Sequence, residues 1–82
     1  MSDIRSRLVA CFAAVFPDLS EGAIPSAAMT SVPGWDSVAA INLITVVEEE
    51  FGVRVDPQHL EELTSFERIE RYLEGKVGKE GP

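Results

Sequence analysis

The segment from Asp36 to Gly52 constrains the fold of this chain more than any other part of the sequence. Asp36 is a good N-cap, because its carboxylate can accept a hydrogen bond from a free amide of the first helical turn, and glycine commonly ends a helix. Between them, the apolar residues spread over a wide arc when successive positions are placed about 100° apart. A helix of this kind is covered on more than one side. The sequence therefore predicts a central helix that starts at Asp36 or Ser37 and ends at Phe51, with a broad apolar face formed by Ala40, Ile41, Leu43, Ile44, Val47 and Phe51.

A second helix is predicted at residues 3–16. Apolar residues recur there at spacings of three and four, which places them on one helical face. Ser2 or Asp3 can cap the start of this helix, and Pro17 cannot continue it. The face consists of Ile4, Leu8, Cys11, Phe12 and Val15.

Two helices are expected after Gly52. A short one is predicted from about Pro57 to Leu63, because proline suits the first position of a helix. The last is predicted to have Thr64 as its N-cap, with Glu67 three residues later completing a capping box, and to end at Gly75. No segment strongly favours a strand. The buried face of the last helix is expected to contain Phe66, Ile69, Tyr72 and Leu73.

The connection from Pro17 to Trp35 is long for a compact domain, and functional or unusually well-packed loops often have this length. Its large apolar residues are expected to pin it to the core. The sequence thus predicts an all-α fold, a small four-helix bundle with a long loop between helices 1 and 2 and a short third helix. We expect one domain at residues 1–75 and a flexible C-terminal tail at residues 76–82. The pinning residues are Ile24, Met29, Val32 and Trp35.

The charge of the chain limits its partners. Fourteen acids against seven bases give a net charge of −7, and residues 36–74 contain ten of the acids but only three arginines. Nucleic-acid binding is disfavoured, because a phosphate backbone requires a basic face. A basic patch on a partner protein is the natural complement. The alternative is that the acidity serves solubility alone.

The cysteine content and the N-terminal apolar run bear on the location of the protein. Cys11 is the single cysteine, so no internal disulfide is expected, and a buried thiol fits a reducing cytoplasm. The apolar run after Arg5 and Arg7 is short, follows Asp3 and lacks a cleavage site, so a helical stripe explains it better than a signal peptide. We expect a monomeric cytoplasmic protein with no membrane span.

Ser37 stands at the start of the central helix, where its hydroxyl could serve as a catalytic nucleophile or as the attachment point of a phosphate ester. As a nucleophile it would need a base and an orienting group, for which only His59 and Asp56 are available. No nucleophile-elbow motif surrounds it, so we expect a non-catalytic protein. Metal binding is not expected either, since Glu48, Glu49 and Glu50 are typical of a helix surface.

Ser37 is better placed to accept a phosphate-linked group on its hydroxyl. Free amides and the helix dipole at a first helical position favour a phosphate by about 0.3–1 kcal/mol. A phosphate ester on the Ser37 hydroxyl would be stabilised there, and the enzyme that attaches the group would supply the base. The alternative from the local sequence is that Ser37 is only a capping residue.

The stretch from Asp36 to Leu73 resembles the acyl carrier protein family. That family has a D-S-L motif at the start of its second helix, and this chain has Asp36-Ser37-Val38. At the family's interval an acidic run and phenylalanine follow, Glu48-Glu49-Glu50-Phe51, and then the segment "LEELTSFERIERYL". The resemblance implies that Ser37 carries 4′-phosphopantetheine from coenzyme A, attached by a phosphopantetheinyl transferase, with Asp36 as helix cap and motif residue.

The resemblance also implies roles for the rest of the central helix. The thiol of the arm would hold acyl groups as thioesters for fatty acid, polyketide or related biosynthesis, and basic patches on partner enzymes would dock on the helix. The docking residues would be Val38, Asn42, Thr45, Glu48 and Glu49. The apolar lining that could shelter an acyl chain would be Ile41, Leu43, Ile44, Val47 and Phe51, which core packing alone also explains.

Two departures from the family pattern bear on the choice of partner. Members that serve fatty acid synthesis commonly have acids two and five residues after the serine, where this chain has Ala39 and Asn42. A specialised pathway, such as polyketide, lipid-modification or aminoacyl carrier work, is therefore an alternative to recognition by housekeeping fatty acid synthase enzymes. An aminoacyl or peptidyl carrier, and an unmodified carrier-like interaction module, are the alternatives.

Overall fold

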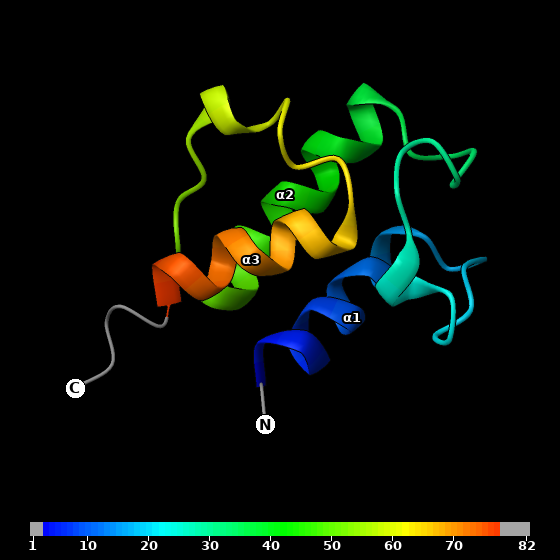
Figure 1. Cartoon of the computed structure of the whole chain (residues 1–82), viewed down its shortest axis with the longest axis horizontal. Helices are drawn as coiled ribbons and strands as arrows, with labels where there is room; N and C mark the ends of the chain where they lie inside the picture. Colours follow the sequence, from blue (N-terminus) through cyan, green and yellow to red (C-terminus); the bar gives the residue numbers. More distant parts are fainter. Residues whose placement is uncertain (1–2, 78–82) are drawn as a thin grey trace.

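The computed structural model describes residues 3–77 of the chain and consists of three α-helices and two short 3₁₀ helices. The α-helices are α1 (Asp3–Val15), α2 (Ser37–Phe51) and α3 (Phe66–Val77), and the 3₁₀ helices are η1 (Ile24–Ser26) and η2 (Pro57–His59). In Figure 1, α3 crosses the molecule while the connection before α2 and the connection after it lie at opposite sides. Within residues 3–77 there is no strand, and no helix is long and apolar enough to cross a membrane.

The all-helical prediction is confirmed, but the short third α-helix is not present. Pro57–His59 form a 3₁₀ helix, and turns continue to Leu63, whose amide donates to the carbonyls of His59 and Leu60 at 3.1 and 3.3 Å. Asp56 Oδ1 accepts a hydrogen bond from the Gln58 amide at 3.1 Å and caps this segment. Seven residues that begin with proline are too few to gain much from α-helical propagation, so tighter turns form instead.

The central helix follows its prediction closely. Asp36 is the N-cap, and its Oδ1 accepts a hydrogen bond from the Ala39 amide at 2.9 Å. Gly52 ends the helix with φ of 65°, in the left-handed region that glycine adopts without steric cost. α1 ends at Val15, one residue before the predicted end, although the Phe16 amide still donates to the Phe12 carbonyl at 2.7 Å.

The predicted ends of the last helix are wrong at both sides. α3 starts at Phe66, and Ser65 rather than Thr64 accepts a hydrogen bond from the Arg68 amide, at 3.2 Å. Thr64 is held elsewhere, because its carbonyl accepts a hydrogen bond from the Met29 amide at 2.9 Å, beside an isolated antiparallel bridge. The helix also continues through Gly75 to Val77, so the predicted tail loses its first two residues to α3. The remainder of that tail, residues 78–82, lies outside the described residues.

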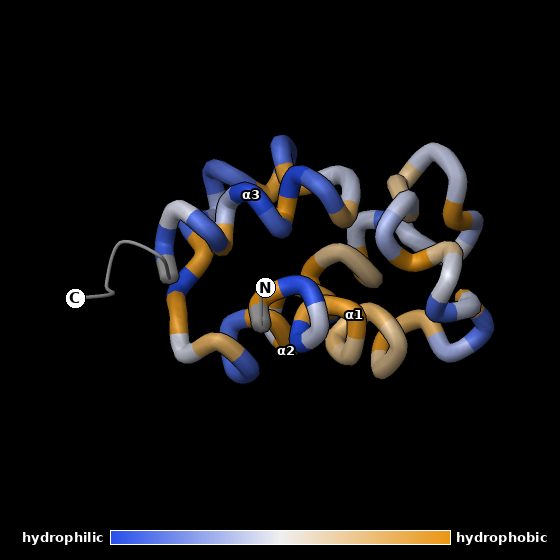
Figure 2. The backbone as a smooth tube through the Cα atoms, turned by 60° about the horizontal axis from the view of Figure 1, so that its bottom comes forward, coloured by the Kyte–Doolittle hydropathy of each residue, from blue (hydrophilic) through white to orange (hydrophobic). Residues whose placement is uncertain are grey.

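The core lies where α1, α2, α3 and the long connection meet. The tube in Figure 2 is mostly hydrophobic along α1, whereas hydrophilic and hydrophobic residues alternate along α3. Phe12 is at the centre, with ring centroids 5.4 Å from Trp35 and 5.2 Å from Phe66. The fully buried side chains are Leu8, Phe12, Ile24, Leu43, Val47, Phe66, Ile69 and Leu73.

Ion pairs join α1 to the other two helices. Arg5 donates two hydrogen bonds of 3.0 Å to Glu70, whose residue is only 8% exposed, and this carboxylate raises the pKa of Arg5. Arg7 donates to Glu50 Oε2 at 2.9 Å and lies 4.6 Å from the centre of the Phe51 ring. Two of the acids on these helices are thus used to hold the fold.

Glu48 also has an internal role. Its Oε2 accepts a hydrogen bond of 2.7 Å from the amide of Val55, a residue that is 6% exposed. This bond fixes the chain as it leaves α2 and turns back towards η2. Glu49, the next residue, is exposed, and its side chain forms no hydrogen bond within residues 3–77.

This difference gives a stability prediction. Glu48→Ala should lower the free energy of unfolding by about 1–3 kcal/mol, because the buried Val55 amide loses its acceptor. The matched change Glu49→Ala should alter it by less than about 0.5 kcal/mol. Urea unfolding followed by the fluorescence of Trp35 measures both. Equal effects of the two variants would show that the Glu48 hydrogen bond does not stabilise the fold.

Candidate functional site

Ser37 is displayed at the first position of α2 by two adjacent features. Behind it, Trp35 is buried to 3% exposure between Phe12 and Phe16, and its amide donates to the Val32 carbonyl at 3.0 Å. Asp36, the residue before Ser37, accepts a hydrogen bond from the amide of Ala39, two residues after Ser37, and this cap fixes the first turn of the helix. With the chain held on both sides, the Ser37 side chain is exposed. Within residues 3–77 its hydroxyl makes no hydrogen bond, so it is free to react.

The start of α2 fits a phosphate ester on this hydroxyl. The Ala39 amide donates to the Asp36 side chain and the Ala40 amide to the Asp36 carbonyl, which leaves the amides of Ser37 and Val38 uncommitted within the described part of the chain. Free amides at a helix start bind anions, and the helix dipole adds to this. The site thus has a hydroxyl to esterify and donors for the phosphate.

Two grooves flank Ser37, one on each side of α2. The first, which we call the η2 groove, has a volume of about 330 Å³ and lies between α2 and the turns after η2. Ser37 itself lines it, and so does the carboxylate residue Glu61. The other lining residues are apolar or small: Met29, Ala40, Ile41, Leu60 and Thr64.

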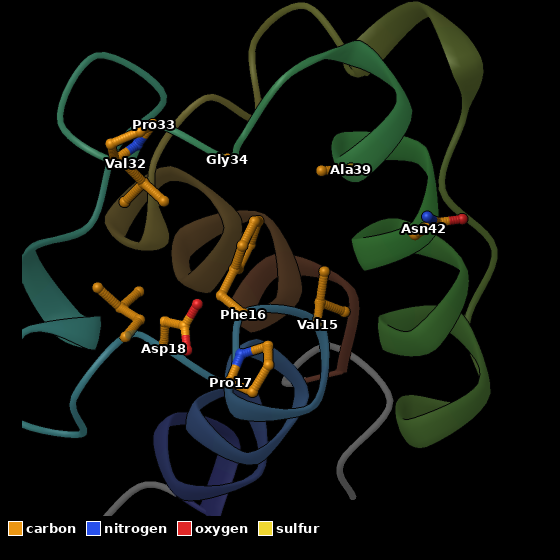
Figure 3. Close-up of a pocket in the computed structure, with 10 residues that line it drawn as sticks. Val15, Phe16, Pro17, Asp18, Val32, Pro33, Gly34, Ala39 and Asn42 are labelled. Atoms are coloured by element: carbon orange, nitrogen blue, oxygen red, sulfur yellow. The ribbon is translucent and has the colours of Figure 1, made fainter.

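The second groove, which we call the α1 groove, has a volume of about 470 Å³. It is lined by residues 15–19, residues 32–34, Ala39 and Asn42. Figure 3 shows the side chains of Phe16 and Val32 facing the opening, with Ala39 across from them on α2. Sequence reasoning missed this groove. The sequence signal that could have indicated it is the pair Ala39 and Asn42, a small and an uncharged residue three positions apart on one face of the helix.

The predicted docking residues are mostly at the surface. Val38 is 67% exposed, and Asn42, Thr45 and Glu49 are exposed as well. The Thr45 hydroxyl donates to the Ile41 carbonyl at 2.9 Å, so it is partly committed to its own helix. Glu48 is the exception, since its carboxylate is engaged with the Val55 amide.

The predicted apolar lining divides into two groups. Leu43, Ile44 and Val47 are buried in the core, and Phe51 is half-buried beneath Arg7. The expectation that Ile41 packs in the core is wrong, because Ile41 is 55% exposed. Its side chain lines the η2 groove instead. An exposed apolar pair, Val38 and Ile41, therefore stands beside Ser37.

The two groups that could activate Ser37 as a nucleophile, Asp56 and His59, make other contacts. The carboxylate of Asp56 accepts from the Gln58 amide. His59 is half-buried, and its ring packs edge-on against Tyr72 at 5.2 Å. Among the described residues neither side chain forms a hydrogen bond with Ser37.

Cys11 is a buried thiol on the face of α1 that packs in the core. Burial raises the pKa of Cys11 to about 11, and the nearby Glu50 carboxylate acts in the same direction. At neutral pH this sulfur is protonated and a poor nucleophile. No group of three or more potential metal ligands occurs within residues 3–77.

The comparison with protein families agrees with this geometry. The family described as phosphopantetheine attachment site matches residues 6–73, which include most of α1, all of α2 with Ser37, and most of α3. No curated protein and no solved structure matches the chain significantly. The match covers most of the chain, and it confirms the predicted resemblance to carrier domains. The chain therefore belongs to the phosphopantetheine-attachment family, whose members carry 4′-phosphopantetheine as a covalently bound cofactor.

Proposed function

We propose that this chain is an acyl carrier protein and that Ser37 is its attachment site. The observation that carries the proposal is the exposed Ser37 hydroxyl, free of hydrogen bonds in residues 3–77, at the start of α2 and inside the matched segment. Asp36 caps the helix that presents it.

The chemistry of attachment needs only a hydroxyl from this chain. Ser37 Oγ attacks the phosphorus that bears the pantetheine group of coenzyme A, and the pyrophosphate P–O bond breaks. Adenosine 3′,5′-bisphosphate leaves, and the hydroxyl proton passes to a base of the transferase. The attached group supplies a thiol that holds acyl cargo as a thioester. The tether keeps that cargo at high local concentration near each partner enzyme.

Partner enzymes are proposed to dock on the exposed side of α2, over Val38, Asn42, Thr45 and Glu49. The exposed apolar surface of Val38 next to Ser37 supports this position. Glu48 contributes less than its neighbour, because its carboxylate is committed to Val55.

The same surface supports partners from specialised biosynthesis. Ala39 and Asn42 leave the first turns of α2 without the acids that carriers for fatty acid synthesis commonly have, and Glu49 is the nearest free acid on the helix. An uncharged face attracts a basic docking patch weakly. We therefore propose a polyketide, lipid-modification or related pathway in preference to housekeeping fatty acid synthesis.

The direct test of attachment is intact-mass measurement after incubation with coenzyme A and a broad-specificity phosphopantetheinyl transferase. The wild type should gain one phosphopantetheine and Ser37→Ala none. The free energy of unfolding of this variant should stay within about 1 kcal/mol of the wild type, because the side chain is exposed. An unmodified wild type would favour the interaction module, and a modified Ser37→Ala would place the site elsewhere.

Thiol reactivity provides a second test of the loaded protein. At about pH 8 the loaded form should have one rapidly alkylated thiol, that of the arm, because Cys11 is buried with a raised pKa. Cys11 should react only after denaturation. Alkylation rates followed by mass spectrometry measure this. An unloaded protein that reacts as fast as a free cysteine would contradict the burial of Cys11.

Restoring the missing acids tests the pathway proposal. The double variant Ala39→Asp with Asn42→Glu should raise kcat/KM with a malonyl transferase of fatty acid synthesis by about tenfold, and the gain should shrink at high salt. Transfer of malonyl groups to the loaded protein measures this. If the wild type is already as good a substrate as the double variant, the uncharged face does not set partner choice.

A further inference from the structure

The α1 groove has an apolar floor and a single charged side chain at its edge. Phe16 and Val32, each only 8% exposed, belong to the core and form part of its lining. Asp18 is the only ionisable residue among those that line it, and its side chain forms no ion pair within residues 3–77. A ligand that fills this groove therefore meets apolar surface and one carboxylate.

The groove is adjacent to the hydroxyl that is modified under the proposed function. Gly34 lies three residues before Ser37 and Ala39 two residues after it, and both line the groove. An enzyme that brings its active site to Ser37 covers these neighbours. On the other side of α2, Ser37 itself lines the η2 groove, so an arm that enters that groove leaves the α1 groove open.

We propose that the α1 groove receives an apolar side chain of the phosphopantetheinyl transferase, next to a lysine or arginine of the same enzyme that pairs with Asp18. This inference rests on the proposed function and adds the part of the carrier surface that the transferase contacts. The apolar floor supplies the affinity, because buried apolar anchors dominate protein interfaces. The rim carboxylate orients the partner and increases its rate of association.

The proposal differs from docking by charge alone along α2. With alanine at position 39 and asparagine at position 42, this side of α2 offers space rather than carboxylates. Two acids near the C-terminal end of the helix already have partners. Glu50 pairs with Arg7, and Glu48 accepts a hydrogen bond from the Val55 amide. Shape is therefore the stronger recognition feature on this face.

The experiment uses the full chain, coenzyme A at saturation and a broad-specificity phosphopantetheinyl transferase, with the carrier concentration varied. Ala39→Phe fills the α1 groove and should raise KM by about tenfold or more, while kcat changes by less than about threefold. Asn42→Phe, a second variant in the same lining, should act in the same direction. Ala14→Phe, exposed on α1 and outside the groove, is the matched control and should behave as the wild type.

The rim is tested by charge reversal in the same loop. Asp18→Lys should raise KM by about three- to tenfold and reduce the salt dependence of the reaction. Glu21→Lys makes the same change of charge three residues further on, outside the groove lining, and should have less than about a twofold effect. Circular dichroism and thermal unfolding confirm that each variant is folded.

The outcomes separate this inference from the function on which it rests. A wild type that takes no phosphopantetheine would remove the proposed function and this inference with it. If the wild type is loaded, and folded Ala39→Phe and Asn42→Phe are loaded equally well, the proposed role of the α1 groove is wrong. The proposed function is not affected by that result. A larger loss in Ala40→Phe, which fills the η2 groove, than in Ala39→Phe would place the partner on the other side of α2 and would also overturn it.

Discussion

The packing of Trp35 between Phe12 and Phe16 is the contact on which the site depends. Its ring centroid lies 5.4 Å from that of Phe12 and 5.7 Å from that of Phe16, so the chain is anchored to the core two residues before Ser37. The Asp36 cap then fixes the direction of α2. Because the buried Trp35 is followed directly by the capped start of α2, the Ser37 side chain lies at the surface.

The sequence predicted those parts of the fold whose signals are local. Asp36 and Gly52 bound α2 because a cap and a left-handed glycine act within one turn of the helix. Thr64 was a reasonable cap by the same rule, but its carbonyl is taken by Met29, 35 residues earlier in the chain, and the helix starts later. Contacts between distant segments carry no local signal, and the α1 groove was missed for the same reason. The exposure of Ile41 and the engagement of Glu48 were misjudged because helical spacing shows which residues share a face but not what covers it.

The acidic excess of the chain is divided between structure and surface. Glu70 and Glu50 pair with arginines of α1, and Glu48 holds the chain after α2. The acids used in this way are less available to a partner, so the net charge of −7 overstates the charge that the protein presents near Ser37. Under the proposed function, recognition then depends on the exposed apolar side chains and the two grooves that flank the start of α2.

The measurement that tests the central claim most directly is the intact mass of the chain isolated from its own cells, followed by peptide mapping. The account predicts a phosphopantetheine on the peptide that contains Ser37, free or bearing an acyl group whose mass identifies the cargo. A native protein without this group, under conditions in which it is expressed and folded, would contradict the carrier function. A group on another residue would contradict the assignment of Ser37.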